Sequence, residues 1–420
     1  MVDRRLNEFV TFARQNSPFY QSLYAGLPGS GLSLTDLPIA DNASFWEANT
    51  VHNNRLLTAP ITDGIVYKTG GTTRAPRLSV YTRGEMRTVS NIWGSGIANA
   101  GLCHGDRVAN LYYAGELYAS FINNLLALQE HPVSNVHLPV GGSAAAEYSA
   151  EVIEELSATV LIGPTTTLCK IASFVTSAGR TLPDVKLLLF AGEAFYADQR
   201  TLLKSAFPDA EVNSGGYASI DGGMLGSPIA GSPDPRVHRV FSPYTLMEII
   251  DADTGEPIME PGRAGRVVTT DLVRRLMPII RYPVGDMAEW VSYPEGIFRL
   301  LGRAEDGARI GPVTLFVDDL RTIVEAVAKN IPIAGMQMVI QRREAKDELV
   351  LRIAGQPENP DAVSKAIITR LNELRPMFAQ HVTKGLIQPL VIEWLAVEKL
   401  EVNQRTGKLV RLIDARSTKL

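Results

Sequence analysis

The stretch Tyr67–Leu78 reads YKTGGTTRAPRL and begins at the end of a short β-type run, GIVYKT. Its two adjacent glycines let the backbone approach a ligand closely. Successive backbone N–H groups in such a turn form a concavity that binds anions, and Lys68, Arg74 and Arg77 add positive charge. We therefore expect an anion-binding loop that leaves a strand. An ordinary Gly/Thr turn is the alternative, and the Walker A pattern GxxxxGK[ST] is absent.

The composition is that of a globular protein without a strong charge bias. Of the 420 residues, 45% are hydrophobic and 20% are charged, and the formal net charge is −4. This balance argues against nucleic acid or an anionic membrane as a partner. Cys103 and Cys169 have no Cys or His at zinc-ligand spacing, and a disulfide framework is excluded. The start carries acids, unlike a signal peptide, and no apolar run reaches the about 18 residues of a membrane span, so we expect a cytoplasmic protein.

Strand-like and helix-like segments alternate over the middle of the chain. The strand candidates are DRVANLYY (106–113), PVSNVHLPV (132–140), TVLIGP (159–164), VKLLLFAGE (185–193) and AEVNSGGY (210–217). Helical patterns separate them, which predicts βαβ units and a parallel sheet. VKLLLFAGE is a near-continuous apolar run, as expected of a strand covered on both faces. The sequence therefore predicts an α/β fold.

The character of the chain changes after Pro228. Alternating segments punctuated by turn signals such as DADTGE and EPGRAG predict an antiparallel β subdomain over about residues 229–300. Beyond the polar, Gly-containing stretch 302–312, helix and strand patterns predict a compact α+β unit with a final strand at 389–401.

Four further stretches place polar groups after strand candidates or near the end of the chain. FAGEA (190–194) ends a buried-type strand, where open α/β sheets bind ligands. NSGGYASIDGG (213–223) offers flexible backbone, one aromatic ring and one carboxylate. RYPVGD (281–286) is interpreted as a turn that presents one acid, and VNQRTGKLVR (402–411) holds one lysine.

Each stretch also has a plain structural explanation. Glu193 would then be a solvated strand end, Tyr217 an aromatic at the edge of the core, Asp286 a turn cap and Lys408 a surface lysine. Taken together, in this order and at these distances, the stretches resemble the adenylate-forming (ANL) superfamily of acyl-CoA synthetases and adenylation domains.

The branch that the chain resembles is the phenylacetate–CoA ligase-like group. Two N-terminal segments, QNSPFYQSLY (15–24) and TDLPIADNASFWE (35–47), also look like that branch. The resemblance implies an N-terminal adenylation core, 1–304, with parallel or mixed sheets, helices and the β subdomain. It also implies a small, mobile α+β C-terminal lid domain, 305–420.

The resemblance assigns ATP and AMP binding to several of the quoted stretches. Tyr217 matches the aromatic that stacks on adenine, and Asp286 matches the acid that binds the ribose hydroxyls. The ATP- and AMP-binding residues it implies are Thr69, Gly70, Gly71, Thr72, Thr73, Gly192, Glu193, Ala194, Ser214, Gly215, Gly216, Tyr217, Asp286 and Arg303.

The resemblance also implies the groups that assist the chemistry. Asp221 matches an acid that helps to hold Mg²⁺, and Lys408 matches the C-terminal lysine that reaches the site during adenylation. Glu305 and Asp306 lie at the implied hinge. A lysine suits this role because an ammonium on a long stem neutralises charge as pyrophosphate leaves. The cofactors implied are ATP, Mg²⁺ and coenzyme A.

The chain departs from the family pattern at several positions, among them Gly70 for a serine and Arg77 for the lysine of the loop. The loop has Arg74 where the family has a glycine, Ile220 replaces a threonine, and Asp221 is one methylene shorter than the usual glutamate. These changes keep open the hypothesis of a catalytically weak nucleotide- or ligand-binding homologue.

The acyl substrate is predicted from aromatic side chains near the ends of strand candidates. Tyr112, Tyr113 and Phe190, with His137 nearby, are the candidate pocket residues, although the tyrosines are equally typical of helix packing. Together with the family resemblance they favour an aryl or heteroaryl carboxylic acid.

The sequence leads to one main function and one close alternative. We expect an AMP-forming acid–thiol ligase that activates a small-molecule carboxylic acid as acyl-AMP and transfers it to coenzyme A. Transfer to a carrier-protein thiol or to an amine in a biosynthetic pathway is the alternative. We expect no nucleic-acid or membrane partner, and a homodimer is expected from the family and from the frequency of two-fold oligomers.

Overall fold

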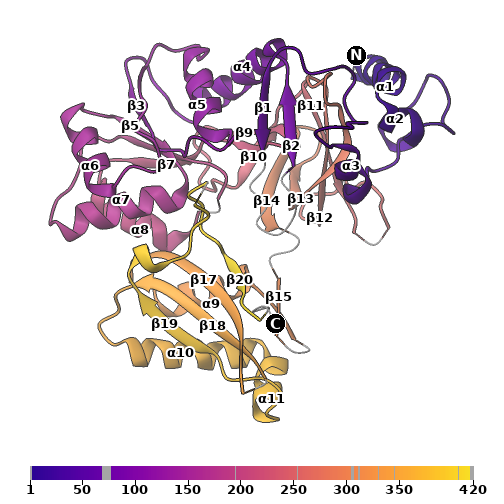
Figure 1. Ribbon diagram of the computed structural model, residues 1–420. Coiled ribbons are helices and arrows are strands. Elements are labelled where there is room, and N and C mark those ends of the chain that lie inside the picture. Colours follow the sequence, from indigo (N-terminus) through magenta and orange to yellow (C-terminus); the bar gives the residue numbers. More distant parts are fainter. Residues whose placement is uncertain are drawn as a thin grey trace.

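The computed structural model describes residues 2–68, 77–193, 195–252, 254–303, 307–310, 313–329, 331–344, 346–404 and 406–416 (Figure 1). The predicted loop residues Thr69, Gly70, Gly71, Thr72 and Thr73, together with Ala194, Glu305 and Asp306, lie outside the described residues. No described helix has both the length and the apolar character that crossing a bilayer requires.

Residues 2–303 form the larger part of the molecule. A five-stranded parallel sheet lies within it, with its strands in the order β4-β3-β5-β6-β7. Its strands are β3 (Arg107–Asn110), β4 (Val136–Leu138), β5 (Val160–Gly163), β6 (Leu187–Phe190) and β7 (Glu211–Ser214). The helices around it are α4 (Arg83–Asn99), α5 (Ser120–Gln129), α6 (Ala146–Glu155), α7 (Thr165–Ser177) and α8 (Ala197–Ala206). The predicted βαβ alternation is confirmed.

Side-chain alternation along β6 explains why its sequence is apolar throughout. Leu188 packs with the residues of α6, α7 and α8 on one face of the sheet. Leu187 and Leu189 pack with α4 and α5 on the other face. Because successive strand residues point to opposite faces, helices on both faces require an unbroken apolar run.

A seven-stranded antiparallel sheet lies beside the parallel sheet, in the order β11-β12-β13-β14-β10-β9-β8 (Figure 1). The antiparallel character is as expected, but the sheet begins at Tyr217 and not near residue 229. Its strands are β8 (Tyr217–Ser219), β9 (Gly223–Pro228), β10 (Val237–Val240), β11 (Thr245–Ile250), β12 (Ala264–Asp271), β13 (Ile279–Ser292) and β14 (Ile297–Arg303).

The expected turn at residues 281–286 is wrong, because the whole stretch lies inside strand β13. Its proline and glycine are accommodated by irregularities in the pairing with β12, where the register shifts twice. Such bulges tolerate residues that otherwise signal a turn.

The N-terminal segment covers the antiparallel sheet with short helices. These are α1 (Val2–Asn16), α2 (Pro18–Leu23) and α3 (Asn42–Ala48), followed by the antiparallel pair β1 (Ile65–Lys68) and β2 (Leu78–Tyr81), with a 3₁₀ turn at Leu34–Asp36. Phe9, Tyr20 and Phe45 pack with Ile249 and Ile280 of the sheet. As predicted, a strand leads into the glycine-rich stretch.

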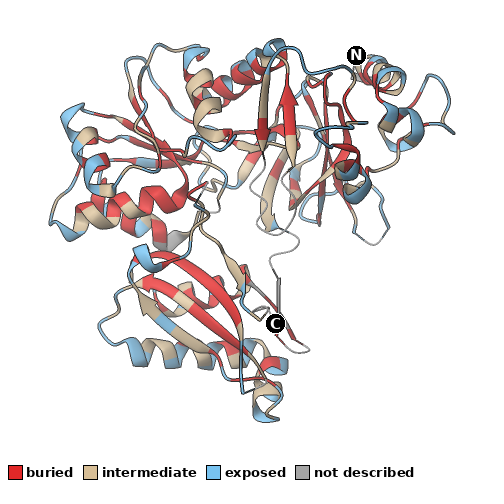
Figure 2. Ribbon diagram, viewed as in Figure 1, coloured by how far each residue is buried: buried red, intermediate tan, exposed pale blue. Residues whose placement is uncertain are grey.

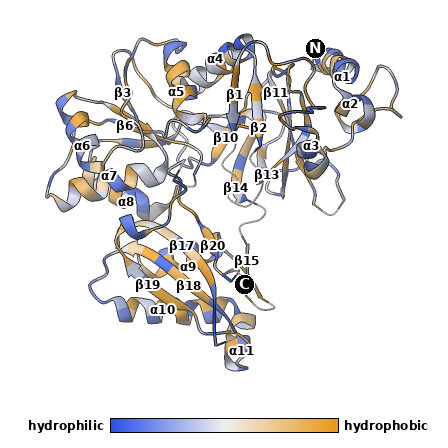
Figure 3. Ribbon diagram, viewed as in Figure 1, coloured by the Kyte–Doolittle hydropathy of each residue, from blue (hydrophilic) through white to orange (hydrophobic). Residues whose placement is uncertain are grey.

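The C-terminal part forms a second, smaller sheet in the order β19-β18-β17-β20, with its own apolar core. Its elements are β15 (Gly307–Ile310), β16 (Val313–Phe316), α9 (Val317–Val327), β17 (Ile333–Arg343), β18 (Lys346–Gly355), α10 (Pro360–Leu374), α11 (Pro376–Thr383), β19 (Val391–Leu395), a 3₁₀ turn at Val397–Lys399, and β20 (Leu412–Asp414). Figure 2 shows β17 and β18 as largely buried, and Figure 3 shows them as mostly hydrophobic. The division into domains at residues 304 and 305 remains a prediction.

The predicted final strand at 389–401 is too long and is not the last. Strand β19 ends at Leu395, and β20 follows near the end of the chain, where it pairs in parallel with β17. Three residues are too few to show a two-residue period, so β20 could not be recognised from its side-chain pattern.

Arg281 forms a buried ion pair within the antiparallel sheet and also holds the N-terminal segment against that sheet. The Arg281 guanidinium donates to Glu248 twice, from Nε to Oε2 at 2.9 Å and from Nη2 to Oε1 at 2.8 Å. Its third nitrogen, Nη1, donates to the carbonyl of Leu37. Arg281 adopts φ 46°, a conformation uncommon for a residue with a side chain. The pair thus fixes an unusual backbone position inside β13.

We predict that Arg281→Ala lowers the free energy of unfolding by about 3–5 kcal/mol, because it leaves the Glu248 carboxylate buried without its partner. Arg4→Ala is the matched control, since its ion pair with Glu8 lies at the surface, where ion pairs contribute little to stability. Urea unfolding followed by circular dichroism measures both. Equal losses in the two variants would contradict the account.

Candidate active site

The carboxyl ends of strands β6 and β7 bring two of the predicted stretches together. Gly192 and Glu193 follow β6, and Ser214 is the last residue of β7. The two strands are parallel neighbours, with Phe190 opposite Ser214. Carboxyl ends of parallel strands share one edge of a sheet, which is where α/β folds bind ligands.

Lys408 lies directly against Gly192. Its Nζ is 2.6 Å from the position that a Cβ on residue 192 would occupy, and its Cε is 2.9 Å from it. Gly192 also has φ 80°, a backbone conformation that residues with a side chain rarely adopt. In Figure 1 the yellow segment before β20 rises from the small sheet to the parallel sheet. The structure therefore brings together Lys408 and Gly192, which are 216 residues apart in the sequence.

Lys408 is carried by a tight turn, residues 402–409, which we call the lysine hairpin. Val402 and Leu409 form an isolated antiparallel bridge. The amide of Asn403 donates to the carbonyl of Lys408 at 2.8 Å, and the amide of Gly407 donates to the carbonyl of Asn403 at 2.8 Å. These bonds fix the hairpin independently of its contact with the larger part.

The Glu193 carboxylate joins the lysine hairpin to helix α7. It accepts from the amide and the hydroxyl of Thr166, at 2.8 Å and 2.9 Å, in the first turn of α7. It also accepts from the amide of Leu409 at 2.6 Å. A carboxylate is favoured at a helix N-terminus, where backbone N–H groups lack partners. Glu193 is therefore a bridge between two parts of the chain, a role that the sequence did not suggest.

The lysine hairpin packs between Gly192 on one side and Tyr113 on the other, and we call this contact surface the seat of the hairpin. The Tyr113 ring fills the space beside Gly142, where an added Cβ would lie 2.3 Å from Cδ2. On the hairpin side, a Cβ on Gly407 would lie 1.8 Å from Cε2 of the same ring. Tyr113, predicted as a pocket residue, is thus sandwiched between two glycines, one of them adjacent to Lys408.

The other predicted pocket residues are only partly brought together. The Tyr112 hydroxyl donates to the carbonyl of Ala191 at 3.4 Å, which places it beside β6. The rings of Phe190 and Phe195 are 4.9 Å apart. His137 lies on β4 at the far edge of the sheet, with its ring 6.5 Å from that of Phe121. Burial lowers the pKa of His137.

Tyr217, Asp286 and Arg303 converge at the antiparallel sheet. The Tyr217 hydroxyl donates to Oδ2 of Asp286 at 2.7 Å. Arg303 Nε lies 3.9 Å from Oδ1 of the same carboxylate, and the two residues are paired in register on β13 and β14. Burial raises the pKa of Tyr217 well above its usual value, so the phenol stays a hydrogen-bond donor.

The backbone before Tyr217 is held by a histidine that the sequence did not single out. Nδ1 of His238 lies 2.9 Å from the carbonyl of Arg236 and must therefore be the donor. Nε2 of the neutral ring then accepts from the Ser214 hydroxyl at 2.8 Å, and that hydroxyl accepts from the amide of Gly216. Burial lowers the pKa of His238 to about 4, which keeps this chain of bonds intact near neutral pH.

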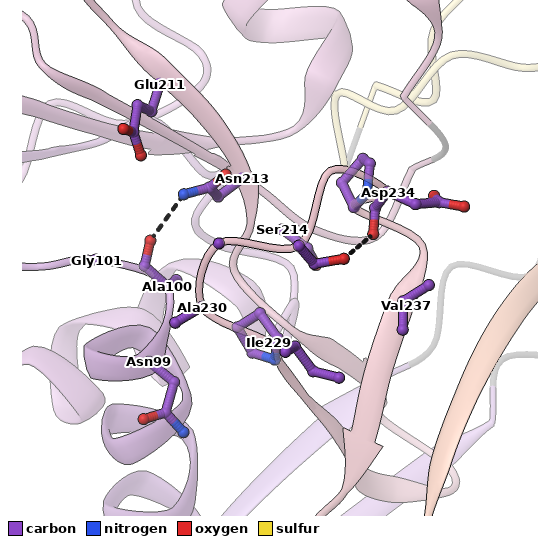
Figure 4. A pocket seen from close by; sticks show the side chains of 14 residues that line it. Asn99, Ala100, Gly101, Glu211, Asn213, Ser214, Ile229, Ala230, Asp234 and Val237 are labelled. Atoms are coloured by element: carbon purple, nitrogen blue, oxygen red, sulfur yellow. Dashed lines mark hydrogen bonds between the residues drawn. The ribbon is translucent and has the colours of Figure 1, made fainter. Parts of the chain in front are cut away.

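A small cavity lies behind this turn but does not include the lysine. It measures about 90 Å³ and is lined by Asn213 and Ser214, the end of α4 and the loop 228–237. Figure 4 shows the Asn213 side chain pointing to Ala100, and its Nδ2 donates to the Ala100 carbonyl at 3.1 Å. Gly192, Glu193 and Lys408 are not among its lining residues.

Asp221 is held by its backbone while one carboxylate oxygen stays available. The carbonyl of Ile220 accepts from the hydroxyls of Ser79 and Tyr81, at 3.0 Å and 3.1 Å, and from Arg274 at 3.2 Å. Arg274, which is fully buried, also donates to the Asp221 carbonyl at 3.0 Å. These contacts tie Asp221 to strand β2, which follows the predicted loop.

The Asp221 carboxylate fits a role in holding a divalent cation. Its Oδ1 is buried and has no hydrogen-bond partner among the described residues, while Oδ2 lies 3.6 Å from Nη1 of Arg77. Burial raises the pKa of Asp221 to about 6, although Arg77 opposes the shift. The described part of the chain contains no cluster of three or more potential metal ligands. One carboxylate is nevertheless consistent with Mg²⁺, which commonly takes one or two carboxylates and completes its shell with phosphates and water.

We predict that Gly407→Ala releases the lysine hairpin from its seat. Its Cβ would collide with the Tyr113 ring, and residue 407 has φ 67°. Overpacking costs at least about 1 kcal/mol, so trypsin should cut after Lys408 about fivefold faster or more. Gly179→Ala is the control, because residue 179 has φ 66° and nothing within 4 Å of an added Cβ. Mass spectrometry of the first fragments gives the rates, and an unchanged rate in Gly407→Ala would contradict the seat.

Comparison with characterised proteins identifies relatives along the whole chain. No family model matches it. The phenylacetate–coenzyme A ligase of Thermus thermophilus is 23% identical over 440 residues, which cover 99% of this chain and 96% of that protein. That of Pseudomonas putida is 25% identical and covers 76% of this chain and 70% of its own. The indoleacetate–lysine synthetase of Pseudomonas savastanoi is 24% identical over 49% of this chain and 47% of its own.

Solved structures show the same fold. A 2-hydroxyisobutyryl-CoA ligase in the postadenylation state, in complex with 2-HIB-AMP, superposes with a TM-score of 0.74 at 20% identity, covering 99% of this chain and 89% of its own. The same ligase in complex with 2-HIB-AMP and CoA, in the thioesterification state, gives a TM-score of 0.62. The chain therefore has the fold of the adenylate-forming acyl-CoA ligases, and phenylacetate–CoA ligases are among its curated relatives. These findings confirm the resemblance drawn from its sequence.

Proposed function

We propose that the protein activates a carboxylic acid with ATP as an acyl adenylate and then transfers the acyl group to coenzyme A as a thioester. The observation that carries the proposal is the position of Lys408, which reaches Gly192 at the carboxyl end of β6 from a separate sheet. The CoA-ligase relatives and the acyl-AMP complexes of structures with this fold support it.

In the first half-reaction, a carboxylate oxygen of the acid attacks the α-phosphorus of ATP. The bond from that phosphorus to the bridging oxygen breaks, and pyrophosphate leaves with the electron pair. The Lys408 ammonium would neutralise charge as it develops on the phosphates, because a preorganised cation stabilises the transition state without reorganisation.

The nucleotide would lie between the two sheets. Tyr217 would stack on the adenine, and Asp286, which accepts from the Tyr217 hydroxyl, would accept from the ribose hydroxyls. Arg303 adds positive charge beside Asp286. Asp221 would hold Mg²⁺ through its free oxygen, and the ion would supply charge neutralisation at the phosphates.

In the second half-reaction, the thiol sulfur of coenzyme A attacks the acyl carbon and loses its proton. The bond from that carbon to the phosphate oxygen breaks, and AMP leaves. The lysine hairpin occupies the seat beside Tyr113 during activation, so we propose that the C-terminal part, 305–420, turns about Glu305 and Asp306 to admit the thiol.

We propose an aryl or heteroaryl acid as substrate. The phenylacetate–CoA ligase relatives support this class, and so do the apolar rings of Phe190 and Phe195 beside the proposed site. An amine acceptor in place of coenzyme A is the second candidate, favoured by the similarity to the indoleacetate–lysine synthetase. Product analysis with coenzyme A, a carrier protein and amines separates the acceptors, and the expected product is the CoA thioester.

Carboxylate-dependent exchange between pyrophosphate and ATP tests the proposal. The wild-type protein should catalyse it with at least one aryl acid, and Lys408→Ala should reduce the rate by about 10²–10³-fold, as expected for the loss of one electrostatic stabiliser. Lys365→Ala, which removes an exposed lysine of α10, should leave the rate unchanged.

Two outcomes of this assay would overturn the proposal. No exchange by the wild-type protein with any acid would indicate a nucleotide- or ligand-binding homologue. Exchange at the wild-type rate in Lys408→Ala would exclude the role of the lysine.

A further inference from the structure

A second contact between the larger part and the C-terminal part is centred on Tyr196, which directly precedes α8. Its hydroxyl donates to Oδ1 of Asp318 at 2.9 Å and accepts from Nη2 of Arg411 at 2.7 Å. Asp318 and Arg411 also form an ion pair with each other. One phenol from the larger part thus completes a triangle whose other two corners belong to the C-terminal part.

The ring of Tyr196 is held as well as its hydroxyl. The guanidinium of Arg321, in helix α9, lies 4.1 Å from the ring centroid, in cation–π geometry. Arg321 is buried, so its charge is poorly solvated and the aromatic face is a favourable neighbour. The same tyrosine therefore has both its polar and its apolar surface covered by the C-terminal part.

The position of Arg411 links this triangle to the lysine hairpin. Arg411 lies three residues after Lys408 and directly before strand β20. Its carbonyl accepts from the amide of Met338 on β17 at 2.9 Å, which anchors it to the small sheet. Fixing Arg411 against Tyr196 therefore fixes the base from which the hairpin reaches Gly192.

We propose that Tyr196 is a positioning residue for acid activation: by binding Asp318 and Arg411, it holds the C-terminal part in the orientation that places Lys408 at the site. This inference rests on the proposed function and adds a residue that neither the sequence motifs nor the nucleotide contacts include. Tyr196 favours the first half-reaction only, because its partners must leave it when the C-terminal part turns.

Tyr196→Phe tests the inference without emptying the space. The phenylalanine keeps the ring on Arg321 but loses both hydrogen bonds to charged groups, and such bonds are among the stronger ones in proteins. We expect pyrophosphate–ATP exchange to fall about tenfold, while formation of the thioester from supplied acyl adenylate and coenzyme A is not slowed. Tyr148→Phe, an exposed tyrosine on α6, is the matched control and should change neither rate.

A structural readout separates positioning from a general loss of fold. Cys103 is exposed and Cys169 is buried, so spin labels on Cys103 and on Ala366→Cys, an exposed position of α10, report the distance between the two parts. We expect one narrow distance distribution in the wild-type protein and a broader one with a second population in Tyr196→Phe, at unchanged thermal stability of each part.

A second variant keeps the inference falsifiable. Asp318→Asn removes the ion pair with Arg411, and its effect on exchange should not add to that of Tyr196→Phe, because both act through one triangle. If the wild-type protein shows no exchange, the proposed function fails. If the wild-type protein shows exchange but Tyr196→Phe matches it in rate and distance distribution, or slows both half-reactions equally, the inference is wrong.

Discussion

The contact on which the rest of the site depends is the Glu193 carboxylate, which accepts from the start of α7 and from the amide of Leu409. One carboxylate thereby caps helix α7 and binds the lysine hairpin through the Leu409 amide. Because Gly192 has no side chain, there is room for Lys408 beside it. The Glu193 carboxylate thus joins the end of β6, the start of α7 and the lysine hairpin. These contacts determine where the Lys408 ammonium lies.

The fold could be predicted wherever side-chain period and burial agree. The unbroken apolar run of β6 implied a sheet covered on both faces, and helices on both faces are what the structure has. The predictions of secondary structure failed where single residues or very short strands hide the periodic pattern of hydrophobic side chains. Pro283 and Gly285 signal a turn, yet β13 continues through them, held at Arg281 by a buried ion pair whose partner is 33 residues away. Short strands such as β20 carry no period at all.

The candidate site could be predicted as a set of segments but not as a set of contacts. The order of the motifs predicted that Lys408, Gly192 and Glu193 share one site. In the structure Lys408 lies against Gly192, and Glu193 accepts from the neighbouring Leu409 amide. His238 and Arg274 were missed because each acts on backbone: His238 through the Ser214 hydroxyl, and Arg274 on the carbonyls of Ile220 and Asp221. A lone inward-facing histidine or a buried arginine has no spacing pattern that would reveal its partners.

Amide hydrogen exchange at Leu409 tests the central contact most directly. If Glu193 holds the hairpin, the Leu409 amide exchanges slowly in the wild-type protein and about tenfold faster or more in Glu193→Ala, since a hydrogen bond to a charged acceptor is lost. The amide of Val339, paired within the small sheet, should exchange equally in both and serves as the internal reference. Equal exchange of Leu409 in the two proteins would contradict the account.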